Sequence, residues 1–145
     1  MSGVLYLVAT PIGNLGDLSP RAAAVLGAAD FIAAEDTRVT MKLLRHLELR
    51  KPLVSYHQHN QASAGPAILS RLLAGETCAL VTDAGTPAVS DPGEALVKLC
   101  AAEGVAVEAI PGCCALVTAL AVSAISTNIN GERNFEKTVR IRCLL

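Results

Sequence analysis

Residues 78–104 read CALVTDAGTPAVSDPGEALVKLCAAEG and contain the three parts of one structural unit. The short aliphatic run CALV is typical of a strand that is buried on both faces of a parallel sheet. The following residues are rich in Gly, Pro and Asp, as a loop is. Asp91, Pro92 and Glu94 then resemble a helix-capping sequence, and Gly104 is placed to end that helix. The stretch therefore predicts a strand, a loop and a helix in this order.

The same order recurs along the chain. We expect strands at 4–9, 30–35, 52–57, 77–83 and 105–112, and helices at 20–29, 37–47, 61–75, 91–104 and 113–124. Five strand–helix repeats with short connections predict an α/β domain with a doubly wound, five-stranded parallel sheet. The right-handed crossover rule leaves few other topologies.

The composition is that of a folded domain. The chain has 145 residues, of which 52% are hydrophobic and 17% charged, so disorder is excluded. The net charge of −1 gives no overall attraction for nucleic acid. The charge is nevertheless uneven, because nine of the twelve Lys and Arg residues lie within 38–51 and 133–142.

The helix expected at 37–47 is amphipathic. Its apolar side carries Val39, Leu43, Leu44 and Leu47. Arg38, Lys42 and Arg45 stand opposite, at positions i, i+4 and i+7. Such a row is usually the solvated face of a surface helix, and contact with a phosphate backbone is the alternative.

The cysteines and the apolar runs bear on the cellular compartment. The five cysteines show no CxxC spacing, so we interpret them as reduced thiols. The longest apolar stretch, 115–125, is shorter than the roughly 18 residues of a membrane span. The first residues lack the basic region of a signal peptide. We therefore expect a cytoplasmic protein without a membrane segment.

Special residues gather after the predicted strands. In an open parallel sheet, ligands bind beyond the carboxyl ends of the strands. The segments there are TPIGN (10–14), EDTR (35–38), HQHN (57–60), DAGTPAVSDPG (83–93) and PGCCA (111–115). Turns need such residues in any case, but their concentration in four of five loops at one edge favours a ligand site. Neither GxGxxG nor GxxxxGK[ST] occurs, so we expect a neutral pocket lined by backbone rather than a phosphate cradle.

Three side chains at this edge are weak candidates for a general base: Glu35, Asp36 and His57. The side chains of the adjacent Glu35 and Asp36 diverge, and Arg38 offers an ion pair, so a structural role is slightly favoured for them. His57 and His59 alternate as on a strand and would share a face, where either can accept a proton or simply line the cleft. No third ligand stands at metal spacing, so no metal site is predicted.

Five segments, in this order and spacing, closely resemble the tetrapyrrole methylase superfamily: TPIGNLGDLSPRA, IAAEDTR, SYHQHN, LVTDAGTPAVSDPG and IPGCCALVTAL. Within it, residues 4–123 resemble the branch of ribosomal RNA small subunit methyltransferase I. The resemblance implies the strand order 3-2-4-1-5, a homodimer, and S-adenosyl-L-methionine as donor in a cleft between two domains. The implied reaction methylates the ribose 2′-hydroxyl of a decoding-region cytidine, so 16S rRNA or the small ribosomal subunit is the implied partner.

The resemblance also implies which residues contact the donor. They are Pro11 in the first loop, Asp83, Ala84, Gly85, Thr86 and Val89 in the fourth, and Cys114 and Ala115 in the fifth. The fifth loop reads PGCC, where the branch has a proline before the second cysteine. The resemblance assigns no general base.

The domain organisation is expected to be incomplete. Residues 1–123 would form the N-terminal domain of a two-domain tetrapyrrole methylase fold, and 124–145 an unmatched tail, with the second domain absent. We interpret the chain as a truncated form. Two alternatives stay open. One is a methyltransferase for tetrapyrroles or diphthine-type substrates, whose first loop would resemble GxGPGD more than TPIGNLGD. The other is a non-catalytic isolated domain.

Overall fold

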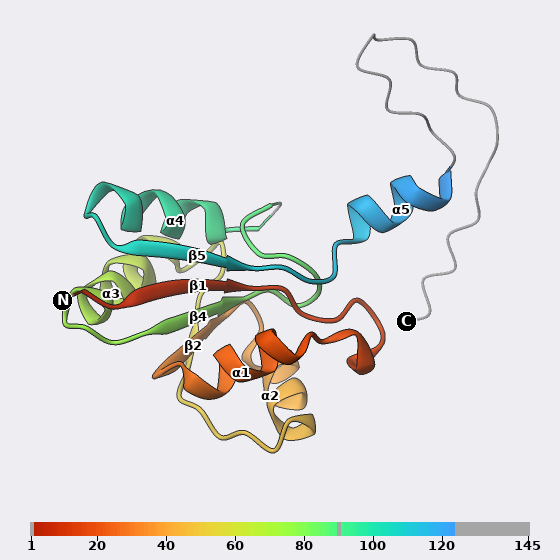
Figure 1. Cartoon of the computed structure of the whole chain (residues 1–145). Coiled ribbons are helices and arrows are strands. Elements are labelled where there is room, and N and C mark those ends of the chain that lie inside the picture. Colours follow the sequence, from red (N-terminus) through yellow and green to blue (C-terminus); the bar gives the residue numbers. More distant parts are fainter. Residues whose placement is uncertain (1, 90, 124–145) are drawn as a thin grey trace, which may run out of the picture.

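A single parallel sheet organises the chain. The structure, a computed structural model, describes residues 2–89 and 91–123. The strands are β1 (Val4–Val8), β2 (Phe31–Ala34), β3 (Leu53–Ser55), β4 (Cys78–Val81) and β5 (Ala106–Ile110). All pair in parallel, in the order β3-β2-β4-β1-β5 (Figure 1). The predicted fold class and strand order are confirmed.

The helices follow the strands as predicted. They are α1 (Pro20–Ala28), α2 (Thr37–His46), α3 (Gln61–Leu73), α4 (Gly93–Ala102) and α5 (Ala115–Ser123), with a short 3₁₀ helix, η1 (Leu15–Asp17), in the first loop. Every expected bound lies within two residues of the observed one. The predicted start of α1 is confirmed, because Ser19 Oγ accepts a hydrogen bond from the Ala22 amide at 3.1 Å and Pro20 follows as the first helical residue.

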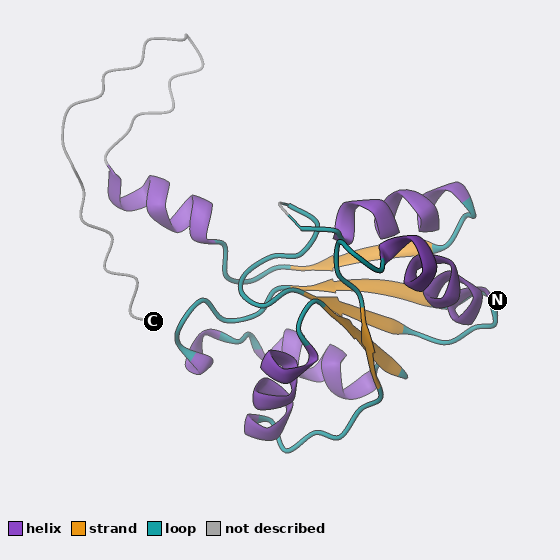
Figure 2. Ribbon diagram, turned by 180° about the vertical axis from the view of Figure 1, so that it is seen from behind, coloured by secondary structure: helices purple, strands orange, loops and turns teal. Residues whose placement is uncertain are grey.

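Helices cover both faces of the sheet (Figure 2), and a buried apolar cluster lies on each face. All residues of β2 and β4 are buried, as expected for aliphatic central strands. On one face, Leu26 of α1 and Leu43 of α2 pack over Ile32. On the other, Ile68 of α3 and Leu96 of α4 belong to a second buried cluster. Each such side chain contributes roughly 1.5–3 kcal/mol when it is removed from water.

The apolar side of α2 differs from the prediction at one position. Leu43 and Leu44 are buried, but Val39 is 37% exposed. Thr40 is buried in its place and donates its hydroxyl to the Asp36 carbonyl at 3.3 Å. A threonine can be buried on a helix when its hydroxyl bonds to the preceding turn.

The register places four strand ends at one edge. Leu7 pairs with Leu80, Ala34 with Val81, and Val8 with Ile110. The chain then leaves β1 and β2 toward the face covered by α1 and α2, and leaves β3 and β4 toward the face covered by α3 and α4. Because β4 lies between β2 and β1, the loop that follows it borders a crevice on each side, where ligands bind in such sheets.

Helix α5 leaves this body. It projects from the end of β5 (Figure 1), and none of its residues is buried. Leu116, Val117 and Val122 are each more than half exposed.

Candidate functional site

Hydrogen bonds join the loops that follow β1, β4 and β5. Thr10 and Gly85 form a two-way bridge, with Thr10 N donating to Gly85 O at 2.9 Å and Gly85 N to Thr10 O at 3.0 Å. The Thr10 hydroxyl also donates to the Thr82 carbonyl at 3.1 Å. Thr86 Oγ1 donates to the Cys113 carbonyl at 2.9 Å. The structure thus brings together the three loops to which the family resemblance assigned the donor contacts.

Two glycines allow these loops to meet. Gly85 has φ +89°, a conformation that strains any residue with a Cβ atom. A Cβ at Gly85 would face the Ile12 side chain and the Cys113 carbonyl, at 3.5 and 3.7 Å. A Cβ at Gly112 would lie 2.8 Å from that of Ala9, which is closer than two carbon atoms can pack. The backbone segments of these loops therefore approach one another more closely at Gly85 and Gly112 than residues with a Cβ atom would allow.

Backbone donors remain available on the joined loops. Within the described residues, the amide groups of Ala84 and Thr86 donate to no acceptor. Cys114 precedes α5, and its carbonyl accepts from the amide and hydroxyl of Thr118 at 3.0 and 2.8 Å. The first amides of α5, from Ala115 onward, are free of helix partners, as at any helix start, and carry partial positive charge.

A hollow of about 580 Å³ opens between the loop after β1, the first residues after β4, and α2. Pro11 and Asp83 line it, together with Thr10, Thr82, Val39 and Lys42. The other six predicted donor contacts are not among its lining residues. Of these, Val89 is 60% exposed on the loop after β4.

At the end of β2, Asp36 is occupied by a structural role. Its Oδ1 accepts from the Arg38 amide at 2.8 Å, so it caps α2. The Arg38 guanidinium contacts both carboxylate oxygens, with Nε at 3.0 and 3.2 Å and the terminal nitrogen at 2.7 Å. These hydrogen bonds lower the pKa of Asp36 to about 2. Asp36 is therefore a poor proton acceptor, and the ion pair expected from the sequence is present.

Asp83 has the opposite electrostatic environment. Its Oδ1 accepts from the Asp36 amide at 3.1 Å. Partial desolvation raises the pKa of Asp83, and the charges of Glu35 and Asp36 raise it further. A carboxylate with a raised pKa is a better proton acceptor near neutral pH. Asp83 was predicted as a donor contact from the family resemblance and was not among the candidate bases, because no local pattern reports the crowding of carboxylates from two strands.

The two histidines lie in a turn rather than on a strand. β3 ends at Ser55, and Asn60 Oδ1 accepts from the His57 amide at 2.8 Å while its Nδ2 donates to the Ser55 carbonyl at 2.9 Å. The rings of His57 and His59 still meet edge to face, with centroids 5.9 Å apart. His57 Nδ1 is buried and has no hydrogen-bond partner among the described residues.

A second, polar hollow of about 310 Å³ lies beside the β4 loop, lined by Glu35, Gln58, Gln61, Asp91 and Pro92. Glu35 accepts a hydrogen bond from the Thr82 hydroxyl at 2.8 Å. Asp91 Oδ1 accepts from the amides of Ala88 and Gly93 at 3.0 and 2.8 Å and so holds the turn before α4. The N-cap residue of α4 is Pro92, which makes no side-chain cap bond, so the predicted helix start at Asp91 is two residues early. Three carboxylates therefore lie near the ends of the loop that follows β4: Glu35, Asp83 and Asp91.

Residues 2–89 and 91–123 contain neither a cluster of metal-ligating side chains nor a membrane-spanning helix. No group of three or more His, Cys, Asp or Glu side chains there is arranged to hold a metal ion. No helix in these two segments is long and apolar enough to cross a membrane.

The fold is that of an α/β domain, and this edge is its candidate ligand site, because ligands bind at such switch points of parallel sheets. The sequence profile of the tetrapyrrole (corrin/porphyrin) methylases matches residues 4–137, and the chain belongs to this family. The resemblance predicted from the five segments is confirmed. The match extends past residue 123, so the expected boundary there stays a prediction, and residues 124–145 lie outside the described residues.

Two relatives carry the same name. Ribosomal RNA small subunit methyltransferase I of Synechocystis sp. is 52% identical over 126 residues, which are 87% of this chain and 45% of that protein. The protein of this name from Halalkalibacterium halodurans is 55% identical over 125 residues, 86% of this chain and 43% of its own length. The chain thus spans less than half the length of these relatives.

A solved structure supports the fold. Uroporphyrin III C-methyltransferase from Thermus thermophilus superposes with a TM-score of 0.62 at 23% identity. The superposition covers 81% of this chain and 52% of the other.

Proposed function

We propose that this chain is the donor-binding part of an S-adenosyl-L-methionine-dependent methyltransferase. Its substrate would be the ribose 2′-hydroxyl of a cytidine in the decoding region of 16S rRNA, within the small ribosomal subunit. The observation that carries the proposal is the junction of the three loops at Thr10, Gly85 and Cys113, in a chain about half identical to ribosomal RNA small subunit methyltransferases.

The residues at this edge fit such a donor. It is a zwitterion with a carboxylate, an ammonium group and a neutral base, and so needs backbone donors and acceptors rather than a phosphate cradle. The free amides of Ala84 and Thr86 and the start of α5 supply donors. Pro11, Asp83, Ala84, Gly85, Thr86, Val89, Cys114 and Ala115 are the residues proposed to hold it. When bound, S-adenosyl-L-methionine supplies a methyl group on a sulfonium that leaves readily.

The protein would then orient the hydroxyl and accept its proton. Alignment contributes most to such a displacement, and a base adds a smaller factor. Asp83 is the best-placed acceptor, since its pKa is raised and it lines the larger hollow of this edge beside Pro11. Asp36 fits this role least, because Arg38 holds it ionised. Glu35, which lines the polar hollow, and His57 are the other two candidates.

The proposal also covers the domain organisation, the oligomeric state and the cellular location. Residues 1–123 would be one domain of a two-domain fold, which the coverage of less than half of the relatives supports. A homodimer is supported by the exposed apolar side chains of α5. A cytoplasmic location fits an enzyme that modifies ribosomal RNA.

Methyl transfer from labelled donor tests the proposal. Small subunits lacking this modification and uroporphyrinogen would each be incubated with the chain, and donor binding would be measured by calorimetry. Label on a cytidine 2′-oxygen is expected. Label on uroporphyrinogen alone would favour the tetrapyrrole alternative, and donor binding without any transfer would favour the isolated non-catalytic domain. A chain that neither binds donor nor transfers label would contradict the proposal.

A further inference from the structure

The described Lys and Arg residues fall into two groups. Outside 42–51, each one forms an ion pair: Arg21 with Glu108, Arg38 with Asp36, Arg71 with Glu76, and Lys98 with Glu94. Within 42–51, Lys42, Arg45, Arg50 and Lys51 have no carboxylate of the described residues within ion-pair distance. Lys51 donates to the Ala29 carbonyl at 2.8 Å. The remaining three cations carry uncompensated charge.

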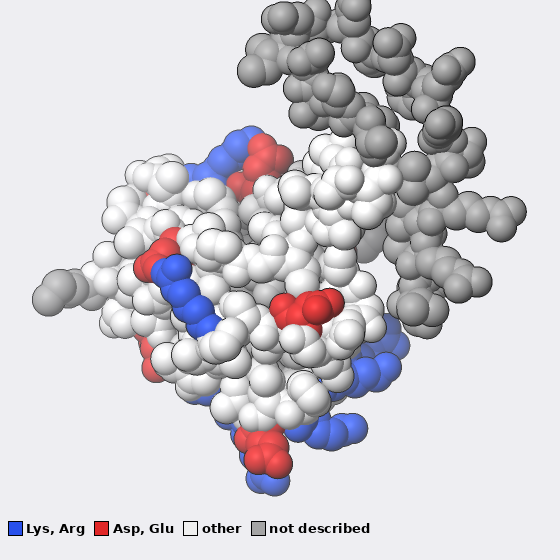
Figure 3. All heavy atoms as spheres, turned by 45° about the vertical axis from the view of Figure 1, so that its right-hand side comes forward, with Lys and Arg blue, Asp and Glu red and all other residues white. Residues whose placement is uncertain are grey.

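These three cations lie along α2 and just beyond its end, at increasing distance in sequence from the candidate site. Lys42 lines the hollow that also contains Pro11 and Asp83. Arg45 lies three residues further on the same exposed side of the helix and, with Arg50, lines another hollow of about 620 Å³ at the far end of α2. Lys and Arg side chains gather in the lower part of Figure 3, the level at which α1 and α2 lie in Figure 1.

The charged side chains that line the hollow at the far end of α2 are mainly basic. Arg45, Arg50 and Lys51 line it, and Glu48 is the acidic side chain in its lining. Its remaining wall includes the apolar side chains of Met41, Leu44, Leu49 and Leu53. A cleft with one sign of charge and low-dielectric walls strengthens the local potential and attracts anions.

We propose that Lys42, Arg45 and Arg50 bind the phosphate backbone of the RNA strand beside the nucleotide presented to the candidate site. The inference rests on the proposed function and names the RNA-contacting surface of that site. Phosphate contacts position a strand without reading its sequence, which suits side chains whose charges are exposed. The apolar wall gives room for an unstacked base next to an arginine, as in single-stranded RNA recognition.

A triple variant tests the surface. In K42Q/R45Q/R50Q, three phosphate contacts are lost, so the slope of log K against log salt concentration becomes shallower by about 2. The same relation gives a loss of affinity of about 100-fold near 0.1 M salt, which vanishes toward 1 M. Binding would be measured with a decoding-region fragment of 16S rRNA at four salt concentrations, and folding checked by circular dichroism.

Two matched controls sharpen the result. K42R/R45K/R50K keeps the charge and should bind within about threefold of the unmodified chain. R21Q/K98Q removes cations that are already paired and should leave the salt slope unchanged. An unchanged affinity in the triple variant, an equal loss in R21Q/K98Q, or no RNA binding by the unmodified chain would overturn the proposal. So would binding of phosphatidylserine vesicles, in place of RNA, with the same dependence on these residues.

The experiment separates this surface from the reaction. If the chain binds RNA with the expected salt slope but transfers no methyl group, the surface stands and the proposed function fails. If it methylates small subunits and the triple variant does so with an unchanged KM for RNA, the reaction stands and the surface is wrong.

Discussion

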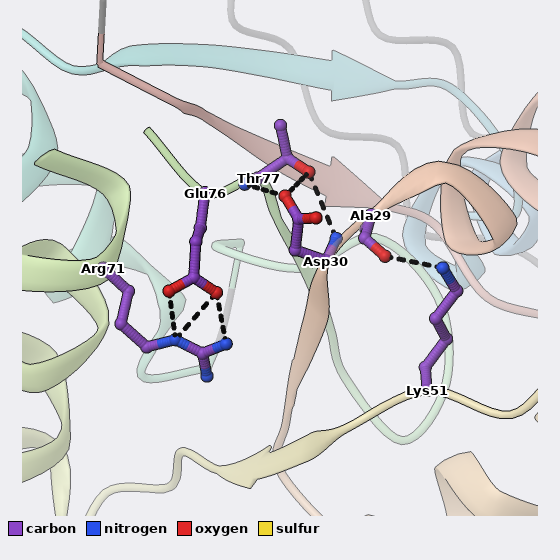
Figure 4. Close-up of polar contacts among 6 residues, drawn as sticks. All are labelled: Ala29, Asp30, Lys51, Arg71, Glu76 and Thr77. Carbon is purple, nitrogen blue, oxygen red and sulfur yellow. Dashed lines mark hydrogen bonds and ion pairs between the residues drawn. The ribbon is translucent and has the colours of Figure 1, made fainter. Parts of the chain in front are cut away.

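The two edges of the sheet use similar residues in different ways. At the amino edge (Figure 4), Asp30 accepts from the amide and hydroxyl of Thr77, both at 2.7 Å, and Arg71 pairs with Glu76. Lys51 closes the group at the Ala29 carbonyl. Hydrogen bonds from Thr77 and Arg71 lower the pKa values of Asp30 and Glu76.

At the carboxyl edge, Asp36 and Asp91 are satisfied in the same way, but other polar groups are not. The amides of Ala84 and Thr86 and the buried His57 Nδ1 have no partner within the described residues, and the pKa of Asp83 is raised. A cluster of polar residues at a sheet edge is thus not by itself a sign of a site. What distinguishes the candidate site is that some of its groups, among them the buried His57 Nδ1, have no partner within the described residues.

The largest effect is expected at Asp83. Asp83→Asn removes the proposed proton acceptor and should lower the rate of methyl transfer by about 100-fold. The rate of the unmodified chain should rise with pH through an apparent pKa above 3.8, as Asp83 loses its proton, and the variant should lack this limb. Single-turnover rates across pH would show it. An unaltered pH profile would remove Asp83 from the mechanism, and Asp36→Asn serves as the comparison.

A smaller effect is expected from a methyl group at Gly85. Gly85→Ala strains the loop by roughly 1 kcal/mol and should weaken donor binding about fivefold. Gly104→Ala is the matched control, because Gly104 also has a positive φ, +69°, with no atom near its added Cβ, and it lies at the other edge. Calorimetry should find unchanged donor affinity in Gly104→Ala. Equal affinities in both variants would show that the β4 loop does not hold the donor.

At the amino edge, the expected effect is on stability alone. Asp30→Ala leaves the amide and hydroxyl of Thr77 without their acceptor and should lower Tm. Donor affinity, measured well below Tm, should stay the same. A parallel loss of affinity would mean that the two edges are coupled and that the contrast between them is incomplete.

The smallest effect concerns acid stability. The pKa of Asp36 is about 2 in the folded chain against 3.8 ordinarily, so its contribution is complete above about pH 4 and is lost as the pH falls through about 2. Asp36→Asn should flatten the fall of the unfolding free energy in that window. Urea titrations at several acidic pH values measure it, and parallel curves for the two proteins would contradict the assignment.

Much of the fold was predictable because its signals are local. The aliphatic runs of β2 and β4 and the Ser19–Pro20 start of α1 lie in consecutive residues, and so does the Asp36–Arg38 pair. The site was less predictable, since its properties come from residues far apart in sequence. The raised pKa of Asp83 depends on Glu35 and Asp36, and the distinction between paired and unpaired cations depends on partners such as Glu108, which is 87 residues from Arg21. The turn at His57 and the exposure of Val39 were missed because alternation and helical spacing do not report tertiary packing.

Helix α5 has nine residues and buries none of them. A helix this short is marginal in water without neighbours, so its amides should exchange with deuterium through local fraying, whereas those of β4 should require opening of the whole domain. Cys114 and Ala115 stand at the start of this helix. One wall of the proposed donor site therefore depends on α5, a helix that buries none of its residues. A contact that stabilised α5 would also increase the affinity for the donor.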